Sequence, residues 1–336
     1  MQQLLEKLCM AVGVSGDEND ALDTAEQLLS PLGEIERTAS HSIICRLPAA
    51  DEKLPHVMLT AHIDRIGLMV TQITDKGFIK TASCGGVDRR SASGARVTVH
   101  AGDKKIKGVV IATPPHLSDG KSLPPKTDGM TVDVGLTKEK AKELISLGDR
   151  ITFDAPFTNL LGDRVCAPAL DDRSGCAAVI RAAQLLRDCG KARVSVALTS
   201  QEESGSAGAK TSAFILKPDY AFAVDVSFAM TPDSDAEDCA ELGNGPMVGI
   251  APILDRKLSK LLIDVAKRRN IPYQTEIMAG STGTDADHIA VSGVGVKTAV
   301  ISIPLRFMHT AGEVASLADI ENTAKLIAET VGGGLC

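Results

Sequence analysis

The sequence VALTSQEESG, residues 196–205, predicts a buried strand that ends beside two adjacent carboxylates, Glu202 and Glu203. One carboxylate can bind a metal while its neighbour stays free to move a proton. This is the division of labour that a water-activating metallohydrolase requires. Adjacent glutamates are common, however, and on their own they more often form part of a solvated surface. The pair gains meaning only if further ligands lie at neighbouring strand ends.

Strands and helices alternate on both sides of this stretch. Before it, a helix is expected over residues 17–31, with Ser15 as a candidate cap, and strands over 42–47 and 56–62. From about residue 165 onwards, the expected elements are a helix after Asp172, strands at 193–199, 219–226 and 296–303, and helices near 207–215, 254–269 and 315–332. Parallel strands connected by helices predict an α/β fold, in which a mixed, mostly parallel sheet is flanked by helices.

A different pattern occupies residues 67–160. Short strand-like runs, for example GLMVTQI at 67–73 and DRITFDA at 149–155, are separated by clusters of Gly, Asp and Pro. This pattern predicts a small inserted domain that is β-rich and barrel-like. The catalytic domain would then consist of residues 1–66 together with 161–336.

Composition and charge exclude several classes of function. The 336 residues suffice for one large domain and a smaller one. Only 3% of the residues are aromatic, none is Trp, the net charge is −7 and no basic run is present, so we expect no nucleic-acid partner. No apolar stretch reaches the length of a membrane span, and the N-terminus lacks the features of a signal peptide. We therefore expect no membrane partner and a cytoplasmic location.

Four more candidate ligands follow expected strands or open an expected helix. They are His62 in LTAHID, Asp171 in ALDDRSG, Asp225 in AVDVS and His309 in MHT. The carboxyl ends of parallel strands meet at one edge of a sheet, which is where such sheets bind their ligands. Independent structural residues need not gather at one edge, so the joint placement of these four with Glu203 predicts a metal centre.

Each ligand taken alone also has a structural explanation. An isolated His62 would more often be a core histidine whose ring is hydrogen-bonded to a backbone carbonyl. If His62 binds a metal instead, Asp64 could accept a hydrogen bond from its other ring nitrogen and so fix its tautomer. Asp171 and Asp172 could simply cap the helix that they open. In the functional interpretation, Asp171 bridges two metals and Asp172 holds the turn. Asp225 closes a buried strand and needs a partner that offsets its desolvation.

Charge supports two metal ions rather than one. Asp171, Glu203 and Asp225 would bring three negative charges together, which an empty cluster does not easily tolerate. Two divalent cations, bound by these carboxylates and two neutral histidines, would leave room for a bridging water. Mixed nitrogen and oxygen ligation suits Zn, Co or Mn, and Zn is the commonest choice for hydrolysis. Glu202 would take the proton from the water and later deliver it to the leaving amine.

At these positions the chain resembles the dinuclear metallo-aminopeptidases of the tetrahedral (TET) and glutamyl aminopeptidase family. The resemblance extends over nearly the whole chain, in the ordered motifs AHIDRIGLMV, ALDDRSG, QEESGSAGA, AVDV, GSTGTDADHI and IPLRFMHT. It implies a zinc-exopeptidase-like catalytic domain. It also implies that His62 and Asp225 bind one metal ion, that Glu203 and His309 bind the other, and that Asp171 bridges the two.

The resemblance assigns further roles near the metals. Glu202 would be the general base, and Asp64 would orient His62. Candidates for contacts with the substrate or with the ligands are Asp172, Thr284, Asp285 and Arg306. The family also implies that the β-rich insert takes part in dimerisation. Its dimers form self-compartmentalised homo-oligomers, often dodecamers, that admit only short peptides.

The chain departs from the family pattern at a few positions. Arg65 stands where members usually carry Glu, and a cation there would alter the surroundings of the ligands or the substrate pocket. Ser204, Ser206 and Ala207 replace bulkier or basic residues that often follow the paired glutamates. None of these changes removes an expected ligand or the base.

The sequence thus favours a metal-dependent aminopeptidase that acts on short peptides through two metal ions and a glutamate base. Two alternatives stay open. The same site could serve a deacylase or a carboxypeptidase-like amidohydrolase on another substrate. The chain could also be a non-catalytic oligomeric scaffold stabilised by metal, although a scaffold does not require a free carboxylate such as Glu202 beside a ligand.

Overall fold

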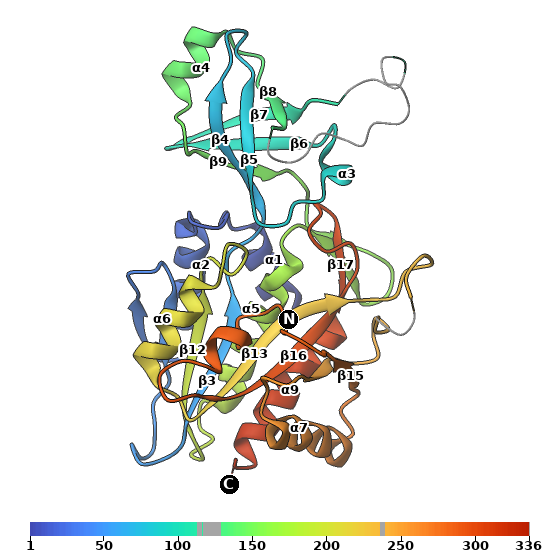
Figure 1. The fold of residues 1–336 in the computed structure, drawn as a ribbon. Coiled ribbons are helices and arrows are strands. Elements are labelled where there is room, and N and C mark those ends of the chain that lie inside the picture. Colours follow the sequence, from blue (N-terminus) through green and yellow to red (C-terminus); the bar gives the residue numbers. More distant parts are fainter. Residues whose placement is uncertain (113–115, 117–128, 236–238, 336) are drawn as a thin grey trace.

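The computed structural model describes residues 1–112, 116, 129–235 and 239–335, and it divides into a large lower body and a smaller upper one (Figure 1). The lower body is built on an eight-stranded sheet, and the upper one is a closed barrel of six strands. The mixed α/β fold and the barrel that the sequence predicts are both confirmed. In the part of the chain that the structure describes, no helix has the length and apolar character that a membrane span needs.

The large sheet has the strand order β1-β2-β12-β3-β13-β16-β14-β15. Its strands are β1 (Glu34–Arg37), β2 (Ile43–Arg46), β3 (His56–His62), β12 (Arg193–Thr199), β13 (Tyr220–Phe228), β14 (Met247–Ile250), β15 (Gln274–Ile277) and β16 (Lys297–Leu305). The four central strands, β12, β3, β13 and β16, run parallel, while β2 pairs antiparallel with β12, and β14 pairs antiparallel with β16. These central strands are buried almost throughout, as expected for a parallel sheet that is covered on both faces.

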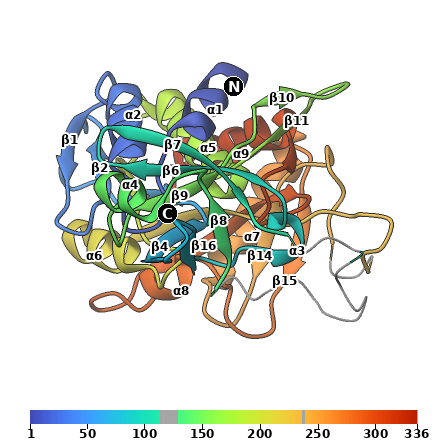
Figure 2. The ribbon, with the colours of Figure 1, turned by 90° about the horizontal axis from the view of Figure 1, so that it is seen from above.

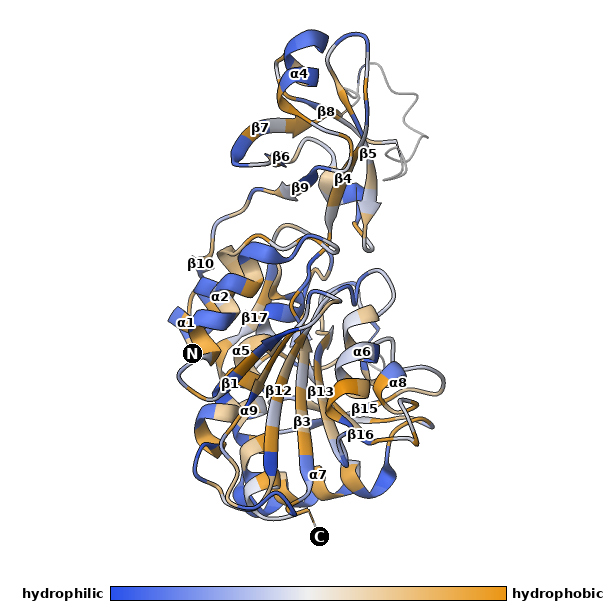
Figure 3. Ribbon diagram, turned by 90° about the vertical axis from the view of Figure 1, so that its left-hand side faces the viewer, coloured by the Kyte–Doolittle hydropathy of each residue, from blue (hydrophilic) through white to orange (hydrophobic). Residues whose placement is uncertain are grey.

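Helices cover both faces of this sheet (Figure 3). One face packs against α1 (Gln2–Met10), α2 (Asn19–Leu29), α5 (Leu170–Leu186), α7 (Arg256–Arg269) and α9 (Leu317–Gly332). The other face packs against α6 (Ala207–Leu216) and the short α8 (Ala286–Ile289). Because successive side chains of a strand point to opposite faces, Leu59 belongs to the first core and its neighbour Met58 to the second.

The barrel has a hydrophobic core of its own, which includes Leu68, Val99 and Ile151. In barrel order, its strands are β4 (Gly67–Ile73), β5 (Ile79–Cys84), β8 (Thr131–Asp133), β7 (Lys104–Val110), β6 (Arg96–Ala101) and β9 (Arg150–Phe153). Two short helices, α3 (Arg89–Ala92) and α4 (Lys138–Leu144), contribute to the same core. Seen from above in Figure 2, the barrel lies over the body that holds the large sheet.

Some local expectations were incomplete or wrong. Strands β1, β5, β14 and β15 were not predicted, and neither was a small sheet of β10 (Thr158–Asn159), β11 (Arg164–Ala167) and β17 (Glu313–Ser316). These strands are short, so their sequences carry little periodicity. Ser15 is not a cap, because α2 begins at Asn19 and is preceded by Glu18. The hydroxyl of Ser15 instead lies 2.7 Å from that of Ser204, directly after the paired glutamates.

Candidate metal centre

Five side chains converge at the edge of the large sheet where its parallel strands end. His62 is the last residue of β3, and Asp225 lies in β13. Asp171 lies at the start of α5, Glu203 lies between β12 and α6, and His309 lies between β16 and β17. The structure therefore brings together all five residues that the sequence singles out as candidate ligands.

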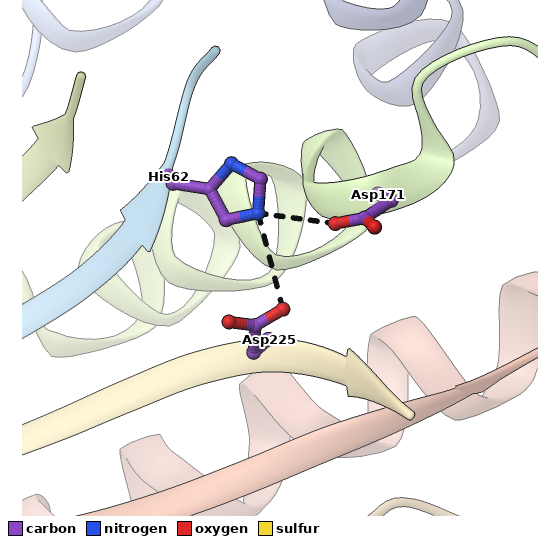
Figure 4. Close-up of side chains that lie close together, drawn as sticks. All are labelled: His62, Asp171 and Asp225. Carbon is purple, nitrogen blue, oxygen red and sulfur yellow. Dashed lines mark hydrogen bonds and ion pairs between the residues drawn. The ribbon is translucent and has the colours of Figure 1, made fainter. Parts of the chain in front are cut away.

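The first cluster consists of His62, Asp171 and Asp225, which each offer a ligand atom within 4.8 Å of the others. Figure 4 shows the three side chains pointing toward one another from three separate elements. His62 Nε2 lies 3.0 Å from Asp171 Oδ1 and 3.9 Å from Asp225 Oδ1. All three residues are buried, so an ion among them would be shielded from solvent.

The second cluster consists of Asp171, Glu203 and His309, and its ligand atoms also lie within 4.8 Å of one another. His309 Nε2 lies 3.2 Å from Asp171 Oδ2 and 3.6 Å from Glu203 Oε2. Asp171 thus directs one carboxylate oxygen to each histidine. A carboxylate shared in this way suits two adjacent cations.

The electrostatics of the clusters fit bound cations. The pKa of Glu203 is raised to about 8, first by burial and then by the charge of Asp171. Burial likewise raises the pKa of Asp225. Burial also acts on Asp171, but hydrogen bonds from His309 and His62 hold the pKa of that carboxyl well below its usual value. In the described structure, Glu203 Oε1 is buried without a hydrogen-bond partner. Crowded carboxylates and imidazoles of this kind are donors that Zn, Co or Mn would satisfy.

Asp64 connects His62 to the paired glutamates. The other ring nitrogen of His62, Nδ1, lies 3.1 Å from the backbone carbonyl of Asp64 and 3.5 Å from its carboxylate. That carboxylate accepts the backbone N–H groups of Glu202 at 3.0 Å and of Glu203 at 3.2 Å. One fully buried side chain therefore holds the turn after β12 beside the histidine at the end of β3.

Glu202 belongs to neither cluster of potential ligands. Its pKa is raised to about 7, chiefly by burial, which the charge of His62 opposes and that of Asp285 reinforces. A carboxyl that titrates near neutrality can both accept and return a proton, because neither form is strongly disfavoured.

Two of the remaining candidates stabilise local turns. Asp172 Oδ1 accepts the backbone N–H of Gly175 at 2.9 Å, which holds the first turn of α5. The Thr284 hydroxyl lies 2.9 Å from that of Thr282 and accepts the N–H of Ala286 at 3.2 Å. In the described structure the other oxygen of Asp172, Oδ2, is buried without a hydrogen-bond partner, and the substrate role of both residues stays a prediction.

Asp285 and Arg306 are the other two candidates for contacts with the substrate or with the ligands. Asp285 is buried, and one of its oxygens accepts a hydrogen bond from Thr199. In the described structure its other oxygen has no partner. Arg306 is half-buried and donates from Nε to the carbonyl of Met230 at 2.6 Å. Both residues are candidates for substrate contacts from the sequence, and that role stays a prediction.

The sequence analysis missed Glu313 and a close approach of the barrel. Glu313 is buried and accepts the backbone N–H groups of two candidate ligands, Asp171 and His309. Its only signal in the sequence is a carboxylate four residues after His309. The segment after β5 also passes the site. A Cβ at Gly85 would lie 2.7 Å from Glu203 Oε2, and one at Gly86 would lie 2.7 Å from His309 Nδ1.

Comparison with known proteins identifies similar chains. The sequence pattern of the family described as M42 glutamyl aminopeptidase matches residues 41–326. A lysyl aminopeptidase of Pyrococcus furiosus is 34% identical over 96% of this chain and 94% of its own. The structure of an aminopeptidase from Desulfurococcus kamchatkensis has a TM-score of 0.91 and 31% identity, and it covers 98% of this chain and 93% of its own. The TET1 peptidase of Pyrococcus horikoshii, described as assembling into a tetrahedron or a large octahedral shell, has a TM-score of 0.85 and 31% identity over 98% of both chains.

Proposed function

The chain belongs to the M42 glutamyl aminopeptidase family, and from this premise we propose that it is a metal-dependent aminopeptidase that removes N-terminal residues from short peptides. The observation that carries the proposal is the position of Glu202. It immediately precedes a candidate ligand, interacts electrostatically with His62, and yet stands outside both ligand clusters. A site that held metal only for stability would have no use for such a carboxylate.

In this proposal His62 and Asp225 hold one divalent ion, Glu203 and His309 hold a second, and Asp171 serves both. When bound, the two ions would polarise the scissile carbonyl and acidify the attacking water. Zn is the ion that we propose first, because it is the commonest hydrolytic ion for a mixed nitrogen and oxygen donor set.

The residues of the chain would divide the remaining work. Glu202 would accept a proton from the attacking water and pass it to the nitrogen of the leaving peptide. Asp64 would fix the position of Glu202 relative to the His62 ring, since its backbone carbonyl contacts the ring and its carboxylate accepts the N–H of Glu202. Burial of this edge of the sheet would limit competition from bulk water and strengthen these interactions.

Assembly forms part of the same proposal. The P. horikoshii relative is described as forming closed shells. We propose that this chain also forms a homo-oligomer, built from dimers up to a dodecamer, and that the inserted domain at 67–160 contributes to the dimer. A closed assembly would admit only short peptides. Size measurement of the purified protein by light scattering would test this point, and a monomer at micromolar concentration would contradict it.

A panel of aminoacyl chromogenic substrates tests the activity. The purified chain is freed of metal with a chelator and then assayed with Zn, Co and Mn in turn. We expect hydrolysis of substrates with a free α-amino group, no hydrolysis of their N-acetylated counterparts, and no activity before metal is returned. Preference for the acetylated substrates would instead identify a deacylase. Recovery of thermal stability without any turnover would identify a scaffold.

A further inference from the structure

Glu313, the first residue of β17, is a buried carboxylate to which the proposed mechanism assigns no role. Its side chain is 1% exposed. Glu313 Oε2 accepts the backbone N–H of Asp171 at 3.0 Å, and Oε1 accepts the backbone N–H of His309 at 2.9 Å. One side chain thus joins two segments that lie 142 and 4 residues away from it along the chain.

The two N–H groups belong to residues whose backbone is neither helical nor part of a strand. Asp171 has φ −79° and ψ 109°, which is extended although it lies within the bounds of α5. His309 has φ +63°, in the left-handed region that disfavours residues with a side chain. The left-handed conformation of His309 persists only when its surroundings impose it. At both residues, the surroundings include the carboxylate of Glu313.

Glu313 can satisfy both donors because each of its two carboxyl oxygens accepts one of them. Burial and the charge of Asp171 raise the pKa of Glu313 to about 8, whereas its two backbone N–H donors and the positive charge of Arg65 lower it. In the described structure, Arg65 forms no ion pair and its Nε has no hydrogen-bond partner.

We propose that Glu313 is a positioning residue that sets the placement of Asp171 and His309, and with it the second cluster of ligands. The inference rests on the proposed function only in taking these two residues as metal ligands. The first cluster depends less on Glu313, because His62 and Asp225 are held by β3 and β13. Loss of Glu313 should therefore weaken one of two bound ions more than the other.

Glu313→Gln tests this selectivity. Glutamine keeps the size of the side chain but has one accepting oxygen, and its NH₂ group would face an N–H donor. We expect calorimetric titration of the metal-free protein with Zn to show two tight ions per wild-type chain. In the variant, we expect the ion of the second cluster to bind about 10- to 100-fold more weakly, and the ion of the first cluster, which is affected only through Asp171, to be weakened less. Activity should return when excess Zn fills the weakened position.

Asp319→Asn is the matched control. Asp319 is also fully buried and accepts two backbone N–H groups, from Gly243 at 2.7 Å and Gly245 at 2.8 Å, but neither belongs to a candidate ligand. This variant should lose stability in urea and still bind two ions as the wild type does.

Two results would overturn the inference: Glu313→Gln binding both ions with wild-type affinity, or losing both to the same degree. If the Gln variant does not fold, Glu313→Asp, which keeps the charge and retracts it by one methylene, is judged by the same two criteria. A wild-type chain that binds two ions but cleaves only acylated peptides would refute the proposed function and leave this inference standing.

Discussion

Glu202→Gln separates proton transfer from metal binding. The side chain keeps its size, and its backbone N–H can still donate to Asp64, so the turn that carries Glu203 should be preserved. Because Glu202 lies outside both ligand clusters, the variant should retain two metal ions per chain. What it loses is a carboxyl whose pKa is raised to about 7 by burial, opposed by His62, and which can exchange a proton near neutral pH.

The expected magnitude follows from that loss. An amide cannot accept the proton of the attacking water, and a positioned general base typically contributes about 10²- to 10⁴-fold to a rate. This corresponds to about 3–5 kcal/mol in the activation free energy. We therefore expect kcat to fall by that factor while KM changes little, because the residues that would hold the ions polarising the substrate carbonyl are unchanged.

The assay measures kcat on an aminoacyl chromogenic substrate alongside the metal content by elemental analysis. Glu203→Gln serves as the comparison, because it alters the neighbouring carboxylate that belongs to the second cluster, and it should lose metal together with activity. A Glu202→Gln protein with two metal ions and kcat within threefold of the wild type would refute the assignment of the base.

Three further predictions follow from the site. Asp171→Asn should reduce the affinity for both ions, since one oxygen of Asp171 faces each histidine, and elemental analysis that finds one ion still fully bound would contradict the shared role. Gly86→Ala should displace the imidazole of His309 and lower metal affinity and kcat, whereas Gly280→Ala, where a Cβ meets nothing within 4 Å, should leave both within twofold. Metal-free protein should lose thermal stability between pH 5 and pH 8, because burial and Asp171 raise the pKa of Glu203 to about 8, so that the folded state binds more protons than the unfolded state across this range. A melting temperature of the metal-free protein that stays constant or rises over that interval would contradict this sign.

Much of the site could be predicted because it follows from a general property of parallel sheets. His62 and Asp225 lie toward the carboxyl ends of strands whose lengths and apolar character are evident in the sequence. Once those strands are parallel neighbours, their ends must meet. The barrel could be predicted in outline, since short strand-like runs separated by turn residues indicate an all-β sandwich or barrel.

What could not be predicted depends on contacts between distant segments. The double role of Asp64, which contacts His62 and also caps the Glu202 turn, requires β3 and β12 to be neighbours in register. Glu313 reaches Asp171 only because β17 returns along β11, which leads into α5. Strands β11 and β17 have only four residues each, which is too few for their periodicity to predict them. Ser15 illustrates the converse error, since a serine before a helix resembles a cap even when its hydroxyl contacts Ser204.

The chain leaves β5 over two glycines, Gly85 and Gly86, that lie against Glu203 and His309 with no space for a side chain between them. The segment that leaves the barrel is therefore in close contact with the candidate metal centre, so another domain could replace the barrel only if it preserved this close approach. We expect relatives to keep glycine at these two positions, because a side chain there would collide with the proposed ligands Glu203 and His309. Residues on the far side of the barrel should vary more. Relatives that keep all five ligands but carry bulky residues at both positions would show that the barrel can be remodelled independently.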